Sequence, residues 1–352
     1  KETECSGCPW LTKDEWPTLD KLDISHISIE NHSVCNLRCT YCSDVYFGGK
    51  LPSYDIKVLF KELSHHKAIR EKFSLVWGGG ESVLLDSFET IFPYLTNQYN
   101  PAHNHVFTNA TTYSPGLEES LRQGKVSITT SIDAGTVETF TAVRGKDKLF
   151  ATLENLKKYH EAGGDSVTIK YILVPENIAE TELAAFIGKI KEFDLAECSF
   201  QISSDFKDEA IGDNVIAAAT FLFDNLKSIG ATLINFDYHL RPRIDKFYAD
   251  KRQDNSGIDN IFDDVIVWGA GEYAMRMLEQ KSLQDKIKFF VDSDPEKQGG
   301  EIDGIVVKPP GAILAEKNAF VFIASMKFHR DIYRELISMG VSADKVIDAT
   351  NF

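Results

Sequence analysis

Three cysteines near the start of the chain have the spacing of a metal-binding loop. Cys35, Cys39 and Cys42 fall within the eight-residue segment CNLRCTYC. Thiolates bind zinc and the iron of iron–sulfur clusters. Zinc would need a fourth ligand, and no second CxxC or HxxxH pair follows. Three ligands on a four-iron cluster leave one iron open to chemistry, so we expect an iron–sulfur centre, with a structural zinc loop as the alternative.

The remaining cysteines give weaker signals. Cys5 and Cys8 form a CxxC that predicts an auxiliary iron–sulfur or metal site, with a redox-active dithiol or no role as alternatives. Cys198 begins a β-rich run, far from the strand end where active groups gather, so we expect a small buried apolar residue. Six cysteines in 352 residues do not make a disulfide scaffold.

A glycine-rich turn in the last third of the chain has the pattern of a dinucleotide-binding loop. Gly269 and Gly271 follow the β-rich run Val265–Trp268, and Asp292 ends the next run, 21 residues after Gly271. Such glycines allow a tight turn, a helix N-terminus favours phosphate, and the acid can bind ribose hydroxyls. The unit is about half of a full dinucleotide fold, so a docking or dimerisation domain is the alternative.

The elements that position these residues follow one repeating order. From about residue 26 to residue 230, β-rich runs alternate with helical patterns such as Leu183, Phe186, Ile187 and Ile190. Six β-then-α units imply parallel strands with right-handed crossovers. We predict an α/β fold with a partial (β/α)6 TIM-like barrel, or an open sheet, and active residues at the carboxyl ends of the strands. The predicted strands are His26–Glu30, Phe73–Trp77, His105–Thr108, Val126–Ile132, Val167–Val174 and Ser199–Ser203.

A charged stretch separates two α/β units. Residues 237–260 break the alternation, so we expect a linker there. Ahead of it we expect an N-terminal cysteine-containing segment at residues 1–25 and the partial barrel at residues 26–236. Beyond it, residues 261–352 predict a small Rossmann-like α/β domain.

The ordered motifs of the first unit resemble those of the radical SAM superfamily. The family signature is CxxxCxxC with an aromatic residue before the last cysteine, as in this loop. Gly78–Glu81 is similar to the family's GGEP segment, although Ser82 replaces the proline. Thr108–Asn109 ends the third predicted strand, and Ser131–Asp133 with Arg144–Gly145 resembles the SID…RG segment. The resemblance covers roughly residues 26–230.

This resemblance implies a [4Fe-4S] cluster on Cys35, Cys39 and Cys42, whose open iron would chelate S-adenosylmethionine. One electron from the cluster would yield a 5′-deoxyadenosyl radical that abstracts hydrogen from a substrate. Glycines let backbone carbonyls approach a ligand, and a carboxylate complements an ammonium. The implied S-adenosylmethionine contacts are Gly79, Gly80 and Glu81 to the methionine amino group, Ser131 and Arg144 to the ribose or carboxylate, and Tyr41 to the adenine. The alternatives are a flexible turn at the glycines and a helix cap at Asp133.

The C-terminal unit gives an indication of the class of substrate. Its segment VIVWGAGEYA…KFFVDSDPEKQG…IDGIVV resembles the small Rossmann-like domain of sugar acyltransferases and some sugar-modifying methyltransferases. This resemblance favours a sugar, a nucleotide-sugar or another small polar metabolite. Asp205, just past the sixth predicted strand, is placed to touch substrate or to cap a loop. Two basic clusters would suit a phosphate or form a solvated face: Lys146 and Lys148, and His239, Arg241, Arg243 and Lys246.

The charge and the hydropathy of the chain argue against nucleic acid and a membrane as partners. A formal charge of −15 argues against nucleic acid, which needs clustered positive charge. No apolar run approaches the roughly 20 residues of a membrane span. The N-terminal stretch lacks the apolar core of a signal peptide, so we expect a cytoplasmic protein.

We therefore predict a radical SAM enzyme, of the oxidoreductase or isomerase type, that acts on a small molecule. It would oxidise, epimerise or rearrange its substrate, and it would receive electrons from a donor such as flavodoxin or ferredoxin. A radical SAM peptide maturase is one alternative, weakened because only about 25 residues precede the first predicted strand. A non-catalytic iron–sulfur sensor or binding protein is the other.

Overall fold

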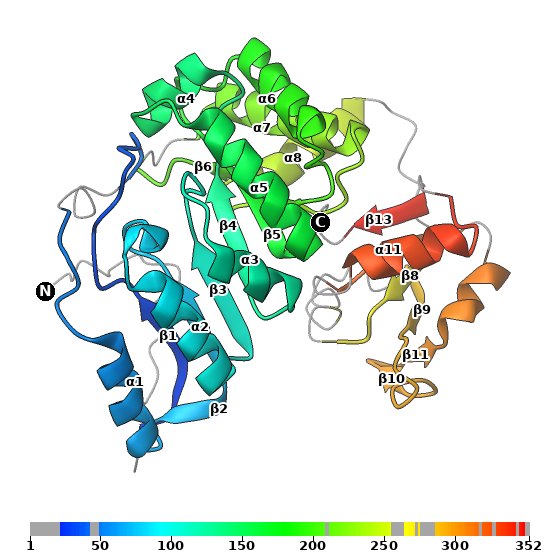
Figure 1. Cartoon of the computed structure of the whole chain (residues 1–352). Helices are drawn as coiled ribbons and strands as arrows, with labels where there is room; N and C mark the ends of the chain where they lie inside the picture. The colour runs from blue at the N-terminus through cyan, green and yellow to red at the C-terminus, as the bar shows by residue number, and fades with distance from the viewer. Residues whose placement is uncertain are drawn as a thin grey trace, which may run out of the picture.

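The chain is built around two β-sheets, which Figure 1 shows with their connecting helices. This computed structural model describes residues 22–42, 49–207, 211–254, 264–271, 274, 286–316, 319–325, 329–342 and 345–348. Among the described helices, none combines the length and the apolar character that crossing a membrane requires.

The first sheet has seven strands in chain order, and every neighbouring pair is parallel. This confirms the predicted α/β class and the parallel arrangement of a partial barrel. The six predicted strands are present, and a seventh, only three residues long, was too short to predict. The strands are β1 (Ile24–Ile29), β2 (Ile69–Trp77), β3 (His103–Phe107), β4 (Ser127–Ser131), β5 (Val167–Leu173), β6 (Ser199–Ser204) and β7 (Ile234–Phe236).

Helices connect successive strands of this sheet, and several begin where the sequence supplies a capping side chain. Asp55 accepts backbone N–H bonds at the start of α1, and Ser114 and Thr136 do so for α3 and α4. The helices are α1 (Ile56–His65), α2 (Phe88–Tyr99), α3 (Pro115–Arg122), α4 (Val137–Arg144), α5 (Leu149–Gly163), α6 (Glu180–Glu192) and α7 (Asp213–Ser228). Short 3-10 helices, η2 (Ser82–Leu84) and η3 (Gly164–Ser166), complete the connections.

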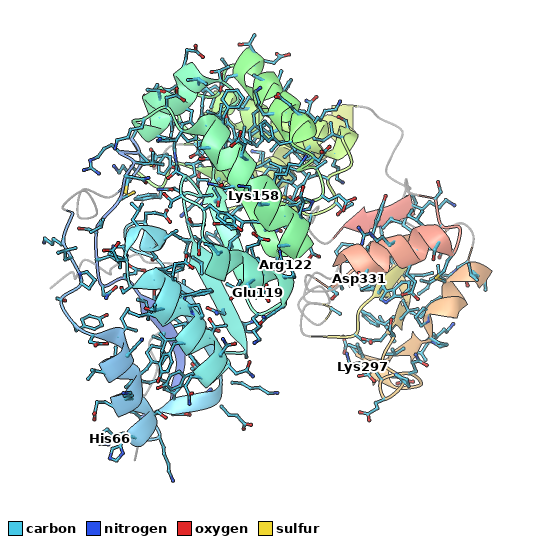
Figure 2. All side chains as sticks on the ribbon, in the orientation of Figure 1. His66, Glu119, Arg122, Lys158, Lys297 and Asp331 are labelled. Atoms are coloured by element: carbon cyan, nitrogen blue, oxygen red, sulfur yellow. The ribbon has the colours of Figure 1, made fainter. Side chains whose placement is uncertain are left out.

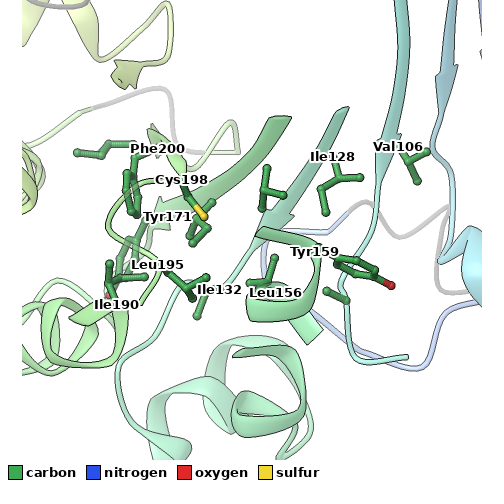
Figure 3. Packing of buried hydrophobic residues seen from close by; sticks show 14 of the residues in the cluster. Val106, Ile128, Ile132, Leu156, Tyr159, Tyr171, Ile190, Leu195, Cys198 and Phe200 are labelled. Carbon is green, nitrogen blue, oxygen red and sulfur yellow. The ribbon is translucent and has the colours of Figure 1, made fainter. Parts of the chain in front are cut away.

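Strand residues alternate between two faces of the first sheet. On β5, Ile169 and Tyr171 belong to the large apolar core shared with the helices, whereas Lys170 and Ile172 point to the opposite face, which we call the inner face. Figure 3 shows part of the core. Cys198 lies there, fully buried beside Phe200, which confirms the predicted apolar role.

The predicted linker needs correction, because helix α8 (Arg241–Asp254) occupies much of residues 237–260. Leu240 and Ile244 are 0% and 2% exposed and belong to the core of the first sheet. Phe247 packs against the same core. These apolar residues recur at helical spacing, but the charged residues around them gave the segment the composition of a linker. The domain boundaries themselves remain a prediction.

The second sheet has the order β10-β11-β9-β8-β12-β13, with only the β10–β11 pair antiparallel. Apolar residues from its strands are buried on both faces, in two separate clusters. Apart from Ala274, the predicted helix Tyr273–Gln280 lies outside the described residues. The Rossmann-like assignment of this unit remains a prediction. Its elements are β8 (Val265–Trp268), β9 (Ile287–Val291), β10 (Glu301–Ile302), β11 (Ile305–Lys308), η4 (Pro310–Ala315), β12 (Phe320–Ile323), α11 (His329–Ser338) and β13 (Val346–Asp348).

Candidate functional site

The three cysteines lie on the loop that follows β1, at the carboxyl edge of the first sheet. Their side chains are half-buried, so a ligand can reach them. The loop docks on the end of α4: the Arg38 N–H donates to the Arg144 carbonyl at 2.9 Å, and the Thr40 N–H donates to the Val143 carbonyl at 2.9 Å. Leu37 anchors the loop between the first two cysteines, with 1% of its surface exposed.

The described residues of this loop fit an iron–sulfur cluster. Burial raises the pKa of the Cys39 thiol to about 11, and the positive charge of Arg144 opposes the rise. The thiols of Cys35 and Cys42 raise the pKa of Cys39 further, so the three sulfur atoms share one electrostatic environment. Within the described part of the chain, no three His, Cys, Asp or Glu side chains converge on one metal ion. Three cysteine thiolates on one loop are a donor set that suits an iron–sulfur cluster, in which each thiolate binds a different iron.

The glycines after β2 lie against the chain that leads into the cysteine loop. The Gly80 N–H donates to the His32 carbonyl at 3.1 Å, and the Glu81 N–H donates to the Val34 carbonyl at 2.7 Å. Gly79 has a φ of +85°, and a Cβ there would lie 2.8 Å from the His32 oxygen. A Cβ at Gly80 would overlap the Val34 backbone oxygen. These glycines therefore let two backbones meet and fix the approach to Cys35.

The side chain of Glu81 is enclosed by its neighbours, and its predicted contact with the methionine amino group remains a prediction. Its side chain is buried, and its two oxygens accept hydrogen bonds from the Thr108 hydroxyl at 2.7 Å and from the Asn109 N–H at 2.5 Å. Burial raises the pKa of Glu81 to about 7, and these hydrogen bonds oppose the rise. The carboxylate thus ties the glycine segment to the end of β3, while the backbones of Gly79 and Gly80 remain candidates for the methionine amino group.

Asp133 joins the cysteine loop to β5 and α4. Its carboxylate accepts hydrogen bonds from the Tyr41 hydroxyl at 2.6 Å, the Arg144 guanidinium at 2.9 Å and the Ile172 N–H at 2.7 Å. Tyr41 and Arg144 also contact each other. Burial raises the pKa of Asp133 and lowers the pKa of Arg144, and the two side chains form a buried ion pair at 2.9 Å.

This network gives Tyr41 and Arg144 a positioning role that sequence reasoning missed. Tyr41 is 8% exposed and packs with Val143, Ile172 and Val174. Arg144 is 4% exposed, and its Nε has no hydrogen-bond partner among the described residues. The adenine and carboxylate contacts predicted for these two side chains remain predictions. Asp133 itself has a φ of +59° and lies before α4, whose cap is Thr136.

Asn109 links the end of β3 to the first cysteine. Its amide donates to the Cys35 sulfur at 3.8 Å and to the Asn36 side-chain oxygen at 2.8 Å. The Asn36 amide in turn donates to the Thr111 hydroxyl at 2.7 Å. Hydrogen bonds to cysteine sulfurs tune iron–sulfur centres, so Asn109 is a further candidate residue of the site. The position of Asn109 at the end of a predicted strand was the one feature of the sequence that could have indicated this role.

A cavity of about 350 Å³ opens beside the carboxyl ends of β5 and β6 and is lined by Asp205 and Lys207. The Lys207 ammonium donates to the Cys42 carbonyl at 2.7 Å and to the Thr40 carbonyl at 3.2 Å, which places the cavity next to the cysteine loop. Asp205 accepts the Lys207 N–H at 3.0 Å, so it caps this turn and also lines the cavity. Sequence reasoning found Asp205 and missed Lys207.

Other predicted site residues are not brought to this edge by contacts within the described chain. Lys146 and Lys148 are exposed between α4 and α5. Arg241 pairs with Asp245 at 2.8 Å, and Arg243 lies 3.6 Å from Asp213. The Arg241 side chain is part-buried, whereas that of Arg243 is nearly half exposed. Cys5 and Cys8 lie outside the described residues.

The second sheet has its own cavity, of about 470 Å³, at the ends of β8, β9 and β12. Asp292 accepts the Ala270 N–H at 2.8 Å and the Lys297 ammonium at 3.0 Å, so the predicted acid does lie beside the glycine turn. Figure 2 labels Lys297 and Asp331, two of the lining residues. The described lining carries four carboxylates against one ammonium, a balance that does not favour phosphate. The carboxylates are Asp292, Asp294, Asp331 and Glu335.

A parallel α/β sheet with a three-cysteine loop at its carboxyl edge is typical of a class of iron–sulfur proteins. The comparison with known protein families points to the same class. Residues 32–187 match the family model of the Radical SAM superfamily, so the chain carries a radical SAM domain. Proteins of this superfamily use a [4Fe-4S] cluster and S-adenosylmethionine. Residues 262–347 match a second family model, described as C2185-like, N-terminal.

Similar proteins with curated functions are GTP 3′,8-cyclases. The Yersinia pestis enzyme is 27% identical over 161 residues, which cover 45% of this chain and 48% of that protein. The Haemophilus influenzae enzyme is 25% identical over 206 residues, which cover 56% of this chain and 59% of that protein. The chain thus spans about half the length of these relatives.

Solved structures with a similar arrangement include Streptococcus suis SuiB bound to S-adenosylmethionine. It is 13% identical, with 61% of this chain and 50% of that chain covered and a TM-score of 0.46. Another is anSMEcpe with bound AdoMet, 18% identical, with 60% of this chain and 64% of that chain covered and a TM-score of 0.46.

Proposed function

We propose that Cys35, Cys39 and Cys42 hold a [4Fe-4S] cluster and that the chain is a radical SAM enzyme acting on a small polar substrate. The observation that carries this proposal is the docking of the cysteine loop. The loop lies against the glycine segment on one side and the end of α4 on the other, at the carboxyl edge of the sheet. Parallel α/β proteins place their active groups at that edge.

When bound, the cluster and S-adenosylmethionine would supply one-electron chemistry that removes hydrogen from an unactivated C–H bond. The chain's own residues would orient them. Backbone atoms of Gly79 and Gly80 suit the methionine amino group, and Ser131 at the end of β4 suits a ribose hydroxyl. The Tyr41–Asp133–Arg144 network would hold the cysteine loop in place around the cluster.

For the substrate, we favour a nucleotide or a sugar, including a nucleotide-sugar. Support comes from the relatives named GTP 3′,8-cyclase, which are 27% and 25% identical to this chain over 161 and 206 residues. The second sheet adds a cavity beside Gly269 and Gly271 that could take a ribose or sugar hydroxyl, because its lining is acidic. The reaction would then be an oxidation, an epimerisation or a rearrangement of that substrate.

Anaerobic reconstitution tests the proposal. Protein loaded with iron and sulfide, then treated with dithionite and S-adenosylmethionine, should release 5′-deoxyadenosine, and Cys35→Ala should not. Cys198→Ala is a matched control, because that cysteine is fully buried in the core and should leave the cluster's electron paramagnetic resonance signal intact. An iron–sulfur sensor would load the cluster and release no 5′-deoxyadenosine. A colourless, zinc-loaded protein would overturn the metal assignment.

A further inference from the structure

Four polar side chains form a row across the inner face of the first sheet. Ser131 of β4 pairs in register with Lys170 of β5, Lys170 pairs with Gln201 of β6, and Gln201 pairs with Asn235 of β7. Residues opposite one another on parallel strands point to the same face. The neighbouring residues Ile132, Ile169 and Ile202 lie in the core on the other face, so all four polar side chains point inward; we call them the polar row.

Within the described part of the chain, the side chains of the polar row lack hydrogen-bond partners. None of its four side chains hydrogen-bonds to another described residue, although all four are half-buried. One step further along β6, the Ser203 hydroxyl is buried and also lacks a partner among the described residues. Buried polar groups in proteins are nearly always satisfied, and closed barrels fill their interior with packed apolar side chains. An inner face lined by unpartnered polar groups is therefore built for water or a ligand.

Lys170 gives the polar row its charge. Burial lowers the pKa of Lys170, while the carboxylates of Asp133 and Asp237 oppose the fall. Neither carboxylate hydrogen-bonds to the ammonium. Asp133 accepts hydrogen bonds from Tyr41, Arg144 and Ile172, and Asp237 accepts hydrogen bonds from four donor groups on three residues. The donors to Asp237 are Ser204, through its N–H and hydroxyl, and the N–H groups of His239 and Leu240.

A half-buried ammonium with three unused donors is costly unless something accepts them. We propose that the polar row is an oxyanion-binding site, in which the Lys170 ammonium binds a phosphate or carboxylate of a small molecule and the amides of Gln201 and Asn235 bind its neighbouring oxygens. The inference rests on the proposed function, since it places that molecule on the inner face of the radical SAM domain. It adds a specific anchor that the cluster motifs do not contain.

Two molecules could bring the oxyanion: the substrate, through a phosphate, or S-adenosylmethionine, through its methionine carboxylate. Ser131, predicted to contact S-adenosylmethionine, is the register partner of Lys170. Gln201 and Asn235 extend the row away from it across two further strands. Both sources present the same chemistry to Lys170, and binding measurements separate them.

The test is equilibrium dialysis of the anaerobically reconstituted protein against three probes: inorganic pyrophosphate, GTP and S-adenosylmethionine. Lys170→Met should weaken binding by about tenfold or more, because a charge-assisted hydrogen bond is lost. Lys170→Arg should restore most of it. Lys191→Met, an exposed lysine at the end of α6, is the matched control and should bind like the wild type.

Weaker pyrophosphate and GTP binding in Lys170→Met assigns the oxyanion to the substrate, and weaker S-adenosylmethionine binding assigns it to the methionine carboxylate. Unchanged dissociation constants for all three probes, or no binding of any probe to the wild type, overturn the proposal. A failure to form 5′-deoxyadenosine would contradict the proposed function, but it would leave the dissociation constants of the three probes unchanged.

Thermal unfolding separates a ligand site from a structural one. Lys170→Met should unfold at the same or a higher temperature than the wild type, because a half-buried charge is removed. A lower unfolding temperature together with unchanged binding would show that Lys170 serves the fold. If Lys170→Met does not fold, Gln201→Leu is measured against the same probes with the same expected loss.

Discussion

Glu81 illustrates how burial changes what a carboxylate can do. The side chain is buried and receives hydrogen bonds from Thr108 and Asn109, and the ligand contact that the sequence motif predicts remains a prediction. Its neighbours tie the glycine segment to the end of β3, beside the residue whose amide contacts Cys35. A carboxylate so enclosed contributes to the order of the site and makes the stability of the protein depend on pH.

Burial raises the pKa of Glu81 from its ordinary value of 4.5 to about 7. Between these two pKa values, the folded chain keeps a proton that the unfolded chain has lost. The stabilisation from this proton is complete below the pKa of the unfolded chain, and it is lost as the pH rises through the pKa of the folded chain. Between about pH 5 and pH 8, the free energy of unfolding of the wild type should fall more steeply than that of Glu81→Gln. Urea unfolding measures both slopes, and equal slopes would contradict this assignment.

At the scale of elements, the site depends on how closely two backbones approach. The segment after β2 hydrogen-bonds along the segment after β1, and only glycine fits at position 80. The same contact sets the path of the chain into Cys35. The glycine motif thus shapes the cysteine loop before any ligand is bound.

Gly80→Ala should destabilise the protein by about 1–3 kcal/mol, because its Cβ would overlap the Val34 backbone oxygen. The same change should lower the iron bound per chain after reconstitution, since Val34 precedes Cys35. Gly188→Ala is the control: this glycine lies inside α6 with no atom near its Cβ position, so the change should stabilise by about 0.5–1 kcal/mol. Chemical denaturation and iron analysis check both variants, and a stable, fully loaded Gly80→Ala would refute the argument.

At the scale of the whole molecule, the two sheets bury separate cores. Among the described residues, an ion pair between Arg334 and Glu197 at 3.2 Å links the two units, with both side chains more than half exposed. Exposed ion pairs of this kind contribute about 0–1 kcal/mol. The two sheets should therefore unfold as separate units.

Phe322→Ala tests that independence, because Phe322 is fully buried in the core of the second sheet. The loss should be about 3–5 kcal/mol, confined to one of two calorimetric transitions. The other transition and the iron content should match the wild type. Leu314→Ala, an exposed residue of η4, is the control and should shift neither transition. A single transition that moves as a whole would show that the two sheets unfold together.

The amino-acid sequence determined the class of fold, the succession of β-strands and helices along the chain and the three-cysteine loop. These features are local: strand and helix periodicities show in short windows, and the cysteine spacing lies within one loop. It also placed Asp292 beside the glycine turn, as the structure confirms. Local reasoning failed for α8, where charged residues hid the apolar pair Leu240 and Ile244.

Only the tertiary structure decided which distant residues meet. Tyr41 and Asp133 are 92 positions apart, and Tyr41 and Arg144 are 103 apart, yet they form one buried network. The polar row around Lys170 likewise depends on register across four strands. Such contacts follow from strand pairing and from the face each side chain takes, and no local window of sequence fixes either of these.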